Sequence, residues 1–359
     1  MIVGQNGAMT LAAEKLVDWR TAALVGRRVA GSGGPMTPVQ RATLSKDFAE
    51  IVPEAERLVK EFTGLASGAY RSRAWVMSRN QWLQANLRGF ERVLEPVAAK
   101  MLSGRSDGAV ATVRRAVLGA QLGGLLGYLG HRVLGQYDVF LPPDDDGLIY
   151  FVGANVASIE QKFRFPPRQF RMWISLHEVT HRIQFGRAPW LRGHLQGLMD
   201  SYLDSMELDA GWLIDRLRGA VEEVRNGGAE YRGFGWVFML MTPDQRDMVR
   251  RMQALMSLLE GHGNYVMDRV SVDLIPSAGR FRRMMHERHN RPGVEKAFQK
   301  AIGFDVKVRQ YDIGQRFVAK AVEQVGMEGF NQVWEGPASL PTMEEIERPE
   351  AWVARVSAS

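Results

Sequence analysis

Cysteine is absent from the 359-residue sequence. Its absence excludes disulfide bonds, thiolate nucleophiles, iron–sulfur clusters and cysteine-ligated zinc. A chain of this length can bury a core large enough to fold without disulfides, and its 45% hydrophobic and 24% charged residues are ordinary for a folded protein. Any metal that the protein holds must therefore be bound by histidine and carboxylate side chains.

Long hydrophobic runs are also missing. The most apolar stretch, Ala116–Gly130, has 15 residues, whereas a transmembrane helix needs about 20. Gly119, Gly123 and Gly127 recur in it every four residues, which favours a buried helix whose backbone lies close to another helix. The first residues, Met1–Thr10, lack the basic and apolar regions of a secretory signal. We therefore expect a cytoplasmic protein that does not bind a membrane.

Positive charge is in small excess, with 46 Lys and Arg residues against 40 Asp and Glu residues and a net charge of +6. The densest basic stretch, Arg280–Arg291, is interrupted by Met284, Met285 and Glu287. This stretch is explained more simply as a solvent-exposed helix face than as a nucleic-acid site, because an excess of charge alone does not establish a binding site. We expect no nucleic-acid partner, and a nucleic-acid binder is the weakest alternative.

Helical periodicity dominates the sequence. The spacing of apolar residues predicts helices over residues 11–29, 82–102, 110–133, 167–185, 191–224, 242–272, 293–302 and 314–325. Pro38–Phe62 is predicted as two short helices that are separated at Pro53. Two short β-rich runs, Tyr137–Leu141 and Leu148–Val152, flank a turn-forming cluster and predict strands. The fold class is therefore mainly α with one small β-hairpin or sheet.

The chain is predicted to form a single domain over residues 1–359. A helical N-terminal part, about 8–105, packs on a metal-site part, about 108–335. From Gly336 onward the prolines Pro337, Pro341 and Pro349 predict an irregular arm, 336–359.

The motif that points to chemistry is His177-Glu178-Val179-Thr180-His181. Its two histidines lie four residues apart, so on a helix they share one face with their side chains about 6 Å apart, close enough for one metal ion. Glu178 follows directly and can reach a water at an open position of that metal. An apolar stripe at helical spacing indicates that this helix packs on a core: Met172, Leu176, Val179 and Ile183.

A catalytic zinc site takes a third protein ligand, and the sequence offers several. They are Glu260, His262 and the acidic residues Asp200, Asp204, Glu207 and Asp209. We prefer Glu260, because a carboxylate inside an apolar helical stretch needs a partner for its charge. Gly261 and Gly263 would let the backbone approach another element closely, and Asn264 could bind the second ring nitrogen of a ligand histidine.

A second histidine pair, His286-Glu287-Arg288-His289, is a decoy. Its histidines lie three residues apart, among arginines and close to Pro292. We interpret it as a surface turn.

Beyond the motif, the sequence resembles the type 2 zincin-like metallopeptidases, a mostly actinobacterial family. The resemblance runs over nearly the whole chain and rests on segments 82–86, 134–138, 151–155, 176–182, 260–262, 309–311 and 340–342. It implies a zincin-type fold with the His177–His181 helix at the active site. The pair Glu260-Gly261 is also similar to the glutamate-glycine pair of gluzincin aminopeptidases, which implies that Glu260 is the third ligand. Some members are labelled as associated with the biosynthesis of a deazaflavin cofactor.

These observations lead to a hypothesis of zinc-dependent hydrolysis of an amide bond in a peptide or a small amide. Zinc activates water, Glu178 acts as general base, and His262 or Tyr265 donates to the oxyanion. Leu148–Val152 is the strand to which an extended substrate could add. The alternatives are a non-catalytic zinc-containing scaffold or accessory protein of a cofactor-biosynthesis pathway, and a hydrolase of a small non-peptide amide.

Overall fold

The computed structural model describes residues 16–31, 36–66, 71–102, 109–138, 147–205, 241–290 and 307–358. The chain forms two compact units, residues 1–33 with 79–132 and residues 34–78 with 133–359. The predicted division near residues 105–108 coincides with none of the three boundaries, because the chain leaves the first unit after residue 33, returns to it at residue 79 and leaves it again after residue 132. That the whole chain acts as a single domain stays a prediction.

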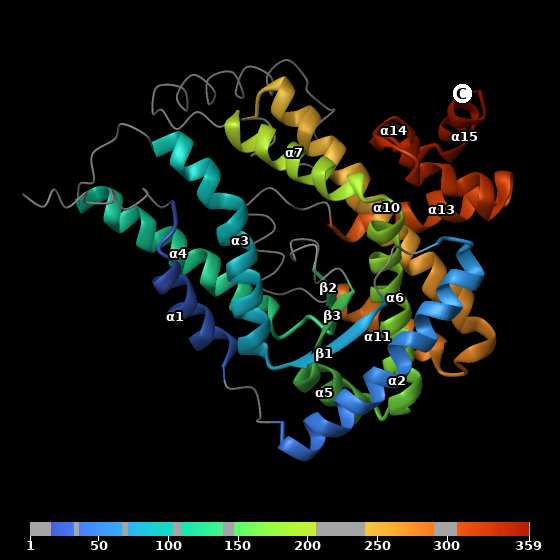
Figure 1. Cartoon of the computed structure of the whole chain (residues 1–359), viewed down its shortest axis with the longest axis horizontal. Coiled ribbons are helices and arrows are strands. Elements are labelled where there is room, and N and C mark those ends of the chain that lie inside the picture. The colour runs from blue at the N-terminus through green and yellow to red at the C-terminus, as the bar shows by residue number, and fades with distance from the viewer. Residues whose placement is uncertain are drawn as a thin grey trace, which may run out of the picture. The chain divides into compact units, whose positions relative to one another are not determined.

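The described part of the first unit consists of three helices, labelled in Figure 1: α1 (Trp19–Ala30), α3 (Arg79–Leu102) and α4 (Ala109–Leu129). Helix α1 begins after Asp18, whose carboxylate accepts hydrogen bonds from the backbone N–H groups of Arg20 and Thr21. Such a cap satisfies donors that the first turn leaves without partners. The interface of α1 and α4 is the main contact within this unit.

The glycines of α4 let it approach α1 at backbone distance. A Cβ atom on Gly123 would lie 2.1 Å from the carbonyl oxygen of Ala22, and one on Gly119 would lie 2.4 Å from that of Asp18. Because no side chain fits there, the four-residue glycine spacing serves helix packing, as predicted. None of the helices in the described ranges is long and apolar enough to cross a membrane.

The second unit contains a three-stranded sheet with the order β1-β3-β2. Strand β1 (Arg73–Met77) runs parallel to β3 (Leu148–Val152), and β2 (Gly135–Tyr137) runs antiparallel to it. The prediction of β3 is confirmed at both ends. Strand β2 shares only Tyr137 with the predicted first strand, 137–141, because it begins at residue 135 and residue 138 is no longer part of it. Residues 139–146 lie outside the described residues.

Two features of the sheet differ from the sequence prediction. Strand β1 was missed, because it is a short run whose partner lies far along the chain: Arg73 pairs with Leu148. The suggestion that a substrate adds to Leu148–Val152 is wrong, since β3 lies in the middle of the sheet with a strand on each side.

Helix α2 (Pro38–Thr63) is continuous, so the predicted break at Pro53 is wrong. The proline occupies an exposed position, while the opposite face of α2 packs on α6 and β1. That packing outweighs the loss of one backbone hydrogen bond. The ends of α2 are well defined by a capping box of Thr37 and Gln40 and by Gly64 in the left-handed conformation, with φ of 68°.

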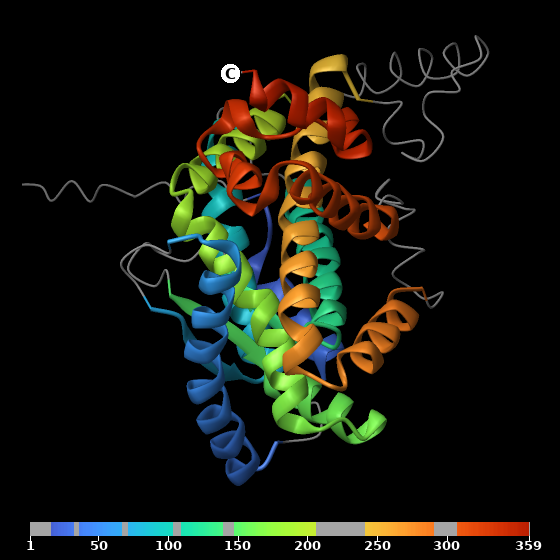
Figure 2. The ribbon, with the colours of Figure 1, turned by 90° about the vertical axis from the view of Figure 1, so that its right-hand side faces the viewer.

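Helix α6 (Pro167–Arg187) lies at the centre of the second unit. It packs against α2 and α10 (Pro243–Leu274), and α10 in turn packs along α13 (Lys307–Phe330). Figure 2 shows α2, α6 and α10 side by side. Most of α6 is buried, as expected for a helix with neighbours on several faces.

Buried ion pairs fix α6 to its neighbours. The Arg171 guanidinium forms two 2.8 Å hydrogen bonds to the carboxylate of Glu160 and also binds Asp47. Arg182, 2% exposed, donates to Glu56 of α2 over 3.4 Å. Removing one partner would leave a buried charge uncompensated, so these contacts specify how α6 is placed in the core.

The remaining elements complete the second unit. They are α5 (Gly153–Phe163), α7 (Trp190–Asp204), α11 (Ala278–Asn290), η3 (Asn331–Trp334), η4 (Pro337–Ser339), α14 (Met343–Glu347) and α15 (Pro349–Ser357). The predicted irregular arm is therefore partly helical, because prolines such as Pro349 stand at the first helical position, where no backbone N–H is needed. Trp352 is fully buried there.

Three further sequence predictions concern α7, α11 and the residues that follow them. The predicted turn at His286 is wrong, since this exposed residue lies within α11. Helix α7 ends at residue 204, and the rest of the predicted helix 191–224 lies outside the described residues, as does the helix predicted at 293–302.

Candidate metal centre

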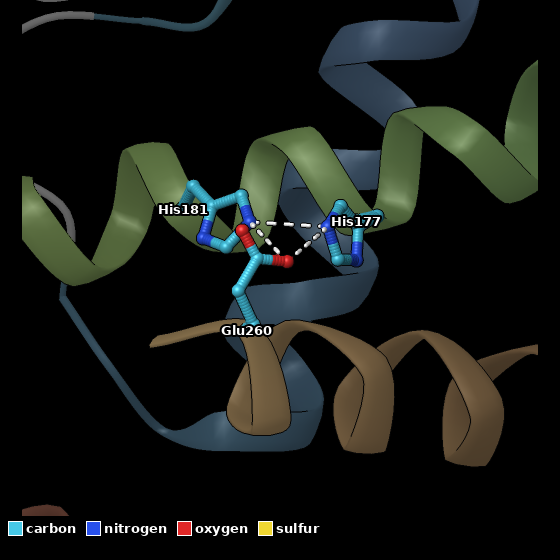
Figure 3. Close-up of side chains that lie close together, drawn as sticks. All are labelled: His177, His181 and Glu260. Atoms are coloured by element: carbon cyan, nitrogen blue, oxygen red, sulfur yellow. Dashed lines mark hydrogen bonds and ion pairs between the residues drawn. The ribbon is translucent and has the colours of Figure 1, made fainter. Parts of the chain in front are cut away.

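His177 and His181 lie on adjacent turns of α6, as the motif predicted. Their Nε2 atoms are 3.1 Å apart, and their rings meet edge to face at an interplanar angle of 87°. Figure 3 shows both rings on the side of α6 that faces α10. At this distance the two Nε2 atoms can bind the same metal ion.

Glu260 reaches the same point from α10, as Figure 3 also shows. Its Oε2 atom lies 3.5 Å from Nε2 of His177 and 3.9 Å from Nε2 of His181. Zinc ligands at bond lengths of 2.0–2.1 Å in a tetrahedron are about 3.3 Å from one another, so the spacing of these three donor atoms fits a zinc ion. Within the described ranges, these residues form the one group of three metal-binding side chains whose ligand atoms all lie within 4.8 Å.

The other acidic candidates for the third ligand are not part of this group. Asp200 and Asp204 lie on α7, half-buried and exposed respectively. Glu207 and Asp209 lie outside the described residues.

The three donors remain open to solvent. The exposed fractions of the side chains are 19% for His177, 13% for His181 and 25% for Glu260. Catalytic zinc sites keep a position for water, whereas structural sites are closed by four protein ligands. The partial exposure is what a catalytic site requires.

Glu178 is held beside the metal-binding group by strand β2. The backbone N–H of Tyr137 donates to its Oε2 atom over 3.1 Å. A Cβ atom on Gly135 would lie 2.6 Å from Cγ of Glu178, so this carboxylate fits against the strand only because residue 135 is glycine. The sequence reasoning found Glu178 but missed its contact with β2, for which the short strand alone gave no signal.

The electrostatic surroundings of Glu178 favour proton uptake. The pKa of its carboxyl group is raised to about 7. Removal from water raises this pKa most and the negative charge of Glu260 also raises it, while His181 and the Tyr137 N–H oppose the rise. A group with a pKa near neutrality is suited to both accepting and releasing a proton at physiological pH.

The glycines after Glu260 make room for the site, as predicted. A Cβ atom on Gly261 would lie 2.2 Å from the carbonyl carbon of Gly314 in α13, so this glycine allows α10 and α13 to touch. A Cβ atom on Gly263 would lie 3.1 Å from the ring of His177 and 3.3 Å from that of His181. Gly263 therefore leaves space for both histidine rings.

His262 does not face the reaction site, contrary to the role predicted for it. It is fully buried, its ring packs against those of Phe330 and Trp334, and its Nδ1 atom accepts a hydrogen bond from Gln184. Burial, together with the nearby His181, lowers the pKa of His262 to about 3, so the ring is neutral. A ring so enclosed cannot reach a substrate oxyanion without unpacking this part of the core.

The other predicted auxiliary residues differ in their surroundings. Tyr265 is half-buried with its ring 6.2 Å from that of Phe62, and its role as oxyanion donor stays a prediction. The second ring nitrogen of His181 binds Gln184 over 2.9 Å, and not Asn264 as suggested from the sequence. Gln184 was missed, although its position one turn after His181 places it on the same face of α6.

Comparisons with known proteins identify the family of this chain. A family model described as zincin-like metallopeptidase matches residues 17–353, which confirms the resemblance noted in the sequence. The chain is similar to a protein of Chloroflexus aurantiacus whose crystal structure is described as that of a proposed hydrolase with a novel fold. The TM-score is 0.70 at 31% identity, over 96% of this chain and 100% of the other. No curated protein matches. With the family model spanning nearly its whole length, this mainly helical chain with its small sheet belongs to the zincin-like metallopeptidase family.

Proposed function

We propose that the protein is a zinc-dependent hydrolase of the gluzincin type that cleaves an amide bond. The observation that carries the proposal is the convergence of His177, His181 and Glu260 from two helices at the spacing of zinc ligands. A zinc ion bound there would polarise the substrate carbonyl and make water acidic enough to attack near neutral pH.

Glu178 supplies the proton transfer in this proposal. Amide hydrolysis adds the hydroxyl group of water to the carbonyl carbon, breaks the C–N bond and delivers a proton to the leaving nitrogen. The carboxylate accepts that proton from water and passes it on, while the Tyr137 N–H holds its Oε2 atom in place. A nearby cation lowers the pKa of a carboxyl group, which keeps Glu178 ionised and ready to act as the base.

The solvent exposure of the donors supports a catalytic centre over a purely structural one. A non-catalytic scaffold with structural zinc would have a closed ligand shell, whereas each donor side chain is 13–25% exposed. The substrate in this proposal is a peptide or a small amide, and the place of action is the cytoplasm, as expected from the sequence.

Metal analysis tests the binding half of the proposal. The wild-type protein should hold about one zinc ion per chain, and His177→Ala and Glu260→Gln should lose it, because two ligands do not retain zinc well. His286→Ala is the matched control, since this histidine is exposed on α11. Full zinc occupancy in both site variants would contradict the assigned ligands.

Turnover of a peptide library, read as new chain termini by mass spectrometry, tests the catalytic half. Glu178→Gln should keep zinc and lower the rate by about 10²–10⁴-fold, the usual contribution of a general base. Glu287→Gln, an exposed glutamate of α11, serves as control. An unchanged rate in Glu178→Gln would reject the base assignment.

A further inference from the structure

Gln184 is a fully buried side chain of α6 that connects the metal-binding group to the interior. Its amide makes three hydrogen bonds: Oε1 lies 2.9 Å from Nδ1 of His181, and Nε2 lies 3.0 Å from the backbone carbonyl oxygen of Leu259 and 2.9 Å from Nδ1 of His262. Leu259 directly precedes Glu260. One amide therefore contacts a candidate ligand on α6 and the neighbour of a candidate ligand on α10.

The direction of every proton in this network follows from the Leu259 carbonyl. A carbonyl oxygen can only accept a hydrogen bond, so the amide atom facing it must be the NH₂ group of Gln184. The other amide atom is then the oxygen, which accepts the Nδ1–H of His181. With its proton on Nδ1, His181 carries a lone pair on Nε2, the atom that faces His177 and Glu260.

The remaining N–H of the Gln184 amide is directed to His262. It donates to the Nδ1 atom of that ring, whose proton is then on Nε2. The ring centroids of Phe330 and Trp334 lie 5.4 Å and 5.3 Å from that of His262. The ring is fully buried and packs against both, so it forms the inner end of the network.

The two histidines of the motif differ in this respect. Nδ1 of His181 has Gln184 as its partner, whereas Nδ1 of His177 is buried without a hydrogen-bond partner among the described residues. Among the described residues, no comparable contact sets the ring orientation or the tautomer of His177. Of the two histidines, only His181 has its orientation and tautomer fixed by Gln184 before a metal binds.

We propose that Gln184 is the positioning residue of the metal centre: its amide oxygen accepts the Nδ1–H of His181 and so fixes the tautomer in which the Nε2 lone pair faces the ion. The proposal rests on the metal site of the proposed function and does not depend on which bond is cleaved. Outer contacts of this kind orient ligand histidines, and their loss typically lowers metal affinity by about 10–100-fold.

Two substitutions separate positioning from simple packing. Gln184→Met keeps the approximate side-chain volume but removes all three hydrogen bonds, so zinc affinity, measured by chelator competition, should fall about 10–100-fold. Gln184→Glu keeps an acceptor for the Nδ1–H of His181 and loses the donors to Leu259 and His262. Its zinc affinity should stay within about threefold of wild type or rise, because a carboxylate raises the basicity of the ligand histidine.

The matched control is Gln253→Met. Gln253 is also a buried glutamine, 6% exposed, and lies on α10 two turns before Glu260. Its substitution should lower the melting temperature without changing zinc affinity. If Gln184→Met and Gln184→Glu weaken zinc binding equally, Gln184 acts through packing and the proposal is overturned.

The tautomer itself can be observed in the wild-type protein, independently of whether any variant folds. With ¹⁵N-labelled histidine, the metal-free protein should show His181 protonated at Nδ1, its signal being identified by its absence in His181→Ala. Protonation at Nε2 would overturn the proposal. A wild-type protein that binds no zinc would instead refute the proposed function, while the tautomer measurement would still decide the role of Gln184.

Discussion

Replacing Gly263 by alanine should weaken zinc binding without touching a ligand. The added Cβ atom would lie 3.1 Å from Cε1 and from Nδ1 of His177, and 3.3 Å from Cε1 of His181. Carbon atoms pack best at about 3.5–4.0 Å, so both rings must retreat by a few tenths of an ångström. Zinc–ligand distances tolerate only about 0.2 Å.

The expected loss follows from that displacement. Both histidine ligands move away from their common point with Glu260, and we expect zinc affinity to fall about 10–100-fold, as for disturbed outer contacts. This corresponds to ~1.4–2.8 kcal/mol. The helix itself does not suffer, because alanine favours a helix interior by about 0.5–1 kcal/mol over glycine.

Chelator competition measures the affinity, and melting temperatures with and without zinc provide a second reading, since the stabilisation by a ligand depends on its concentration relative to Kd. Gly197→Ala on α7 is the control, because nothing lies within 4 Å of a Cβ atom there. The control should keep the wild-type affinity. A Gly263→Ala variant with affinity within twofold of wild type would show that this glycine does not set the ring positions.

Three further outcomes are expected. In Gly135→Ala, the new Cβ atom would lie 2.6 Å from Cγ of Glu178, so the carboxylate must move by ~1 Å. Turnover should then fall ~10²-fold while zinc affinity stays unchanged. Turnover equal to that of the wild type would refute the importance of this contact. At full zinc occupancy, His262→Phe should leave turnover within about threefold, because the ring is buried. A larger loss with zinc bound would restore its predicted role in oxyanion binding. For Glu56, burial raises the pKa, but hydrogen bonds from Lys60 and Ser72 and the charge of Arg182 lower it to about 2 from 4.5. The folded-state pKa is therefore depressed, and its contribution, up to ~3 kcal/mol, is present above pH 4.5 and lost as the pH falls toward 2. Thermal melts of Glu56→Gln should show a deficit at pH 7 that closes near pH 2, and a deficit independent of pH would contradict this.

The histidines of the candidate metal site could be predicted because their evidence is local. A four-residue spacing places His177 and His181 on one helix face whatever surrounds the helix. Glu260 could be predicted from its charge, since a carboxylate among apolar neighbours needs a partner. Its distances to both histidines agree with that reasoning.

The errors concern features that tertiary contacts decide. Pro53 does not break α2, because its exposed position leaves the packed face of the helix intact. Strand β1 is defined by pairing with β3, which no short window of sequence contains. His262 was assigned to the reaction on the strength of its residue type, whereas its function in the structure depends on Gln184 and on the aromatic rings around it.

The burial of α6 has a consequence for how the proposed zinc ion would bind. Helix α6 is packed against α2 and α10 and is anchored by Arg171 and Arg182, so its backbone amides should exchange with solvent only when the unit opens globally. The histidine spacing is thus maintained before any ion arrives. A zinc finger folds only on metal uptake, whereas here the proposed ligands would already be in place when zinc arrives, so little of the coordination energy would be spent on ordering the site.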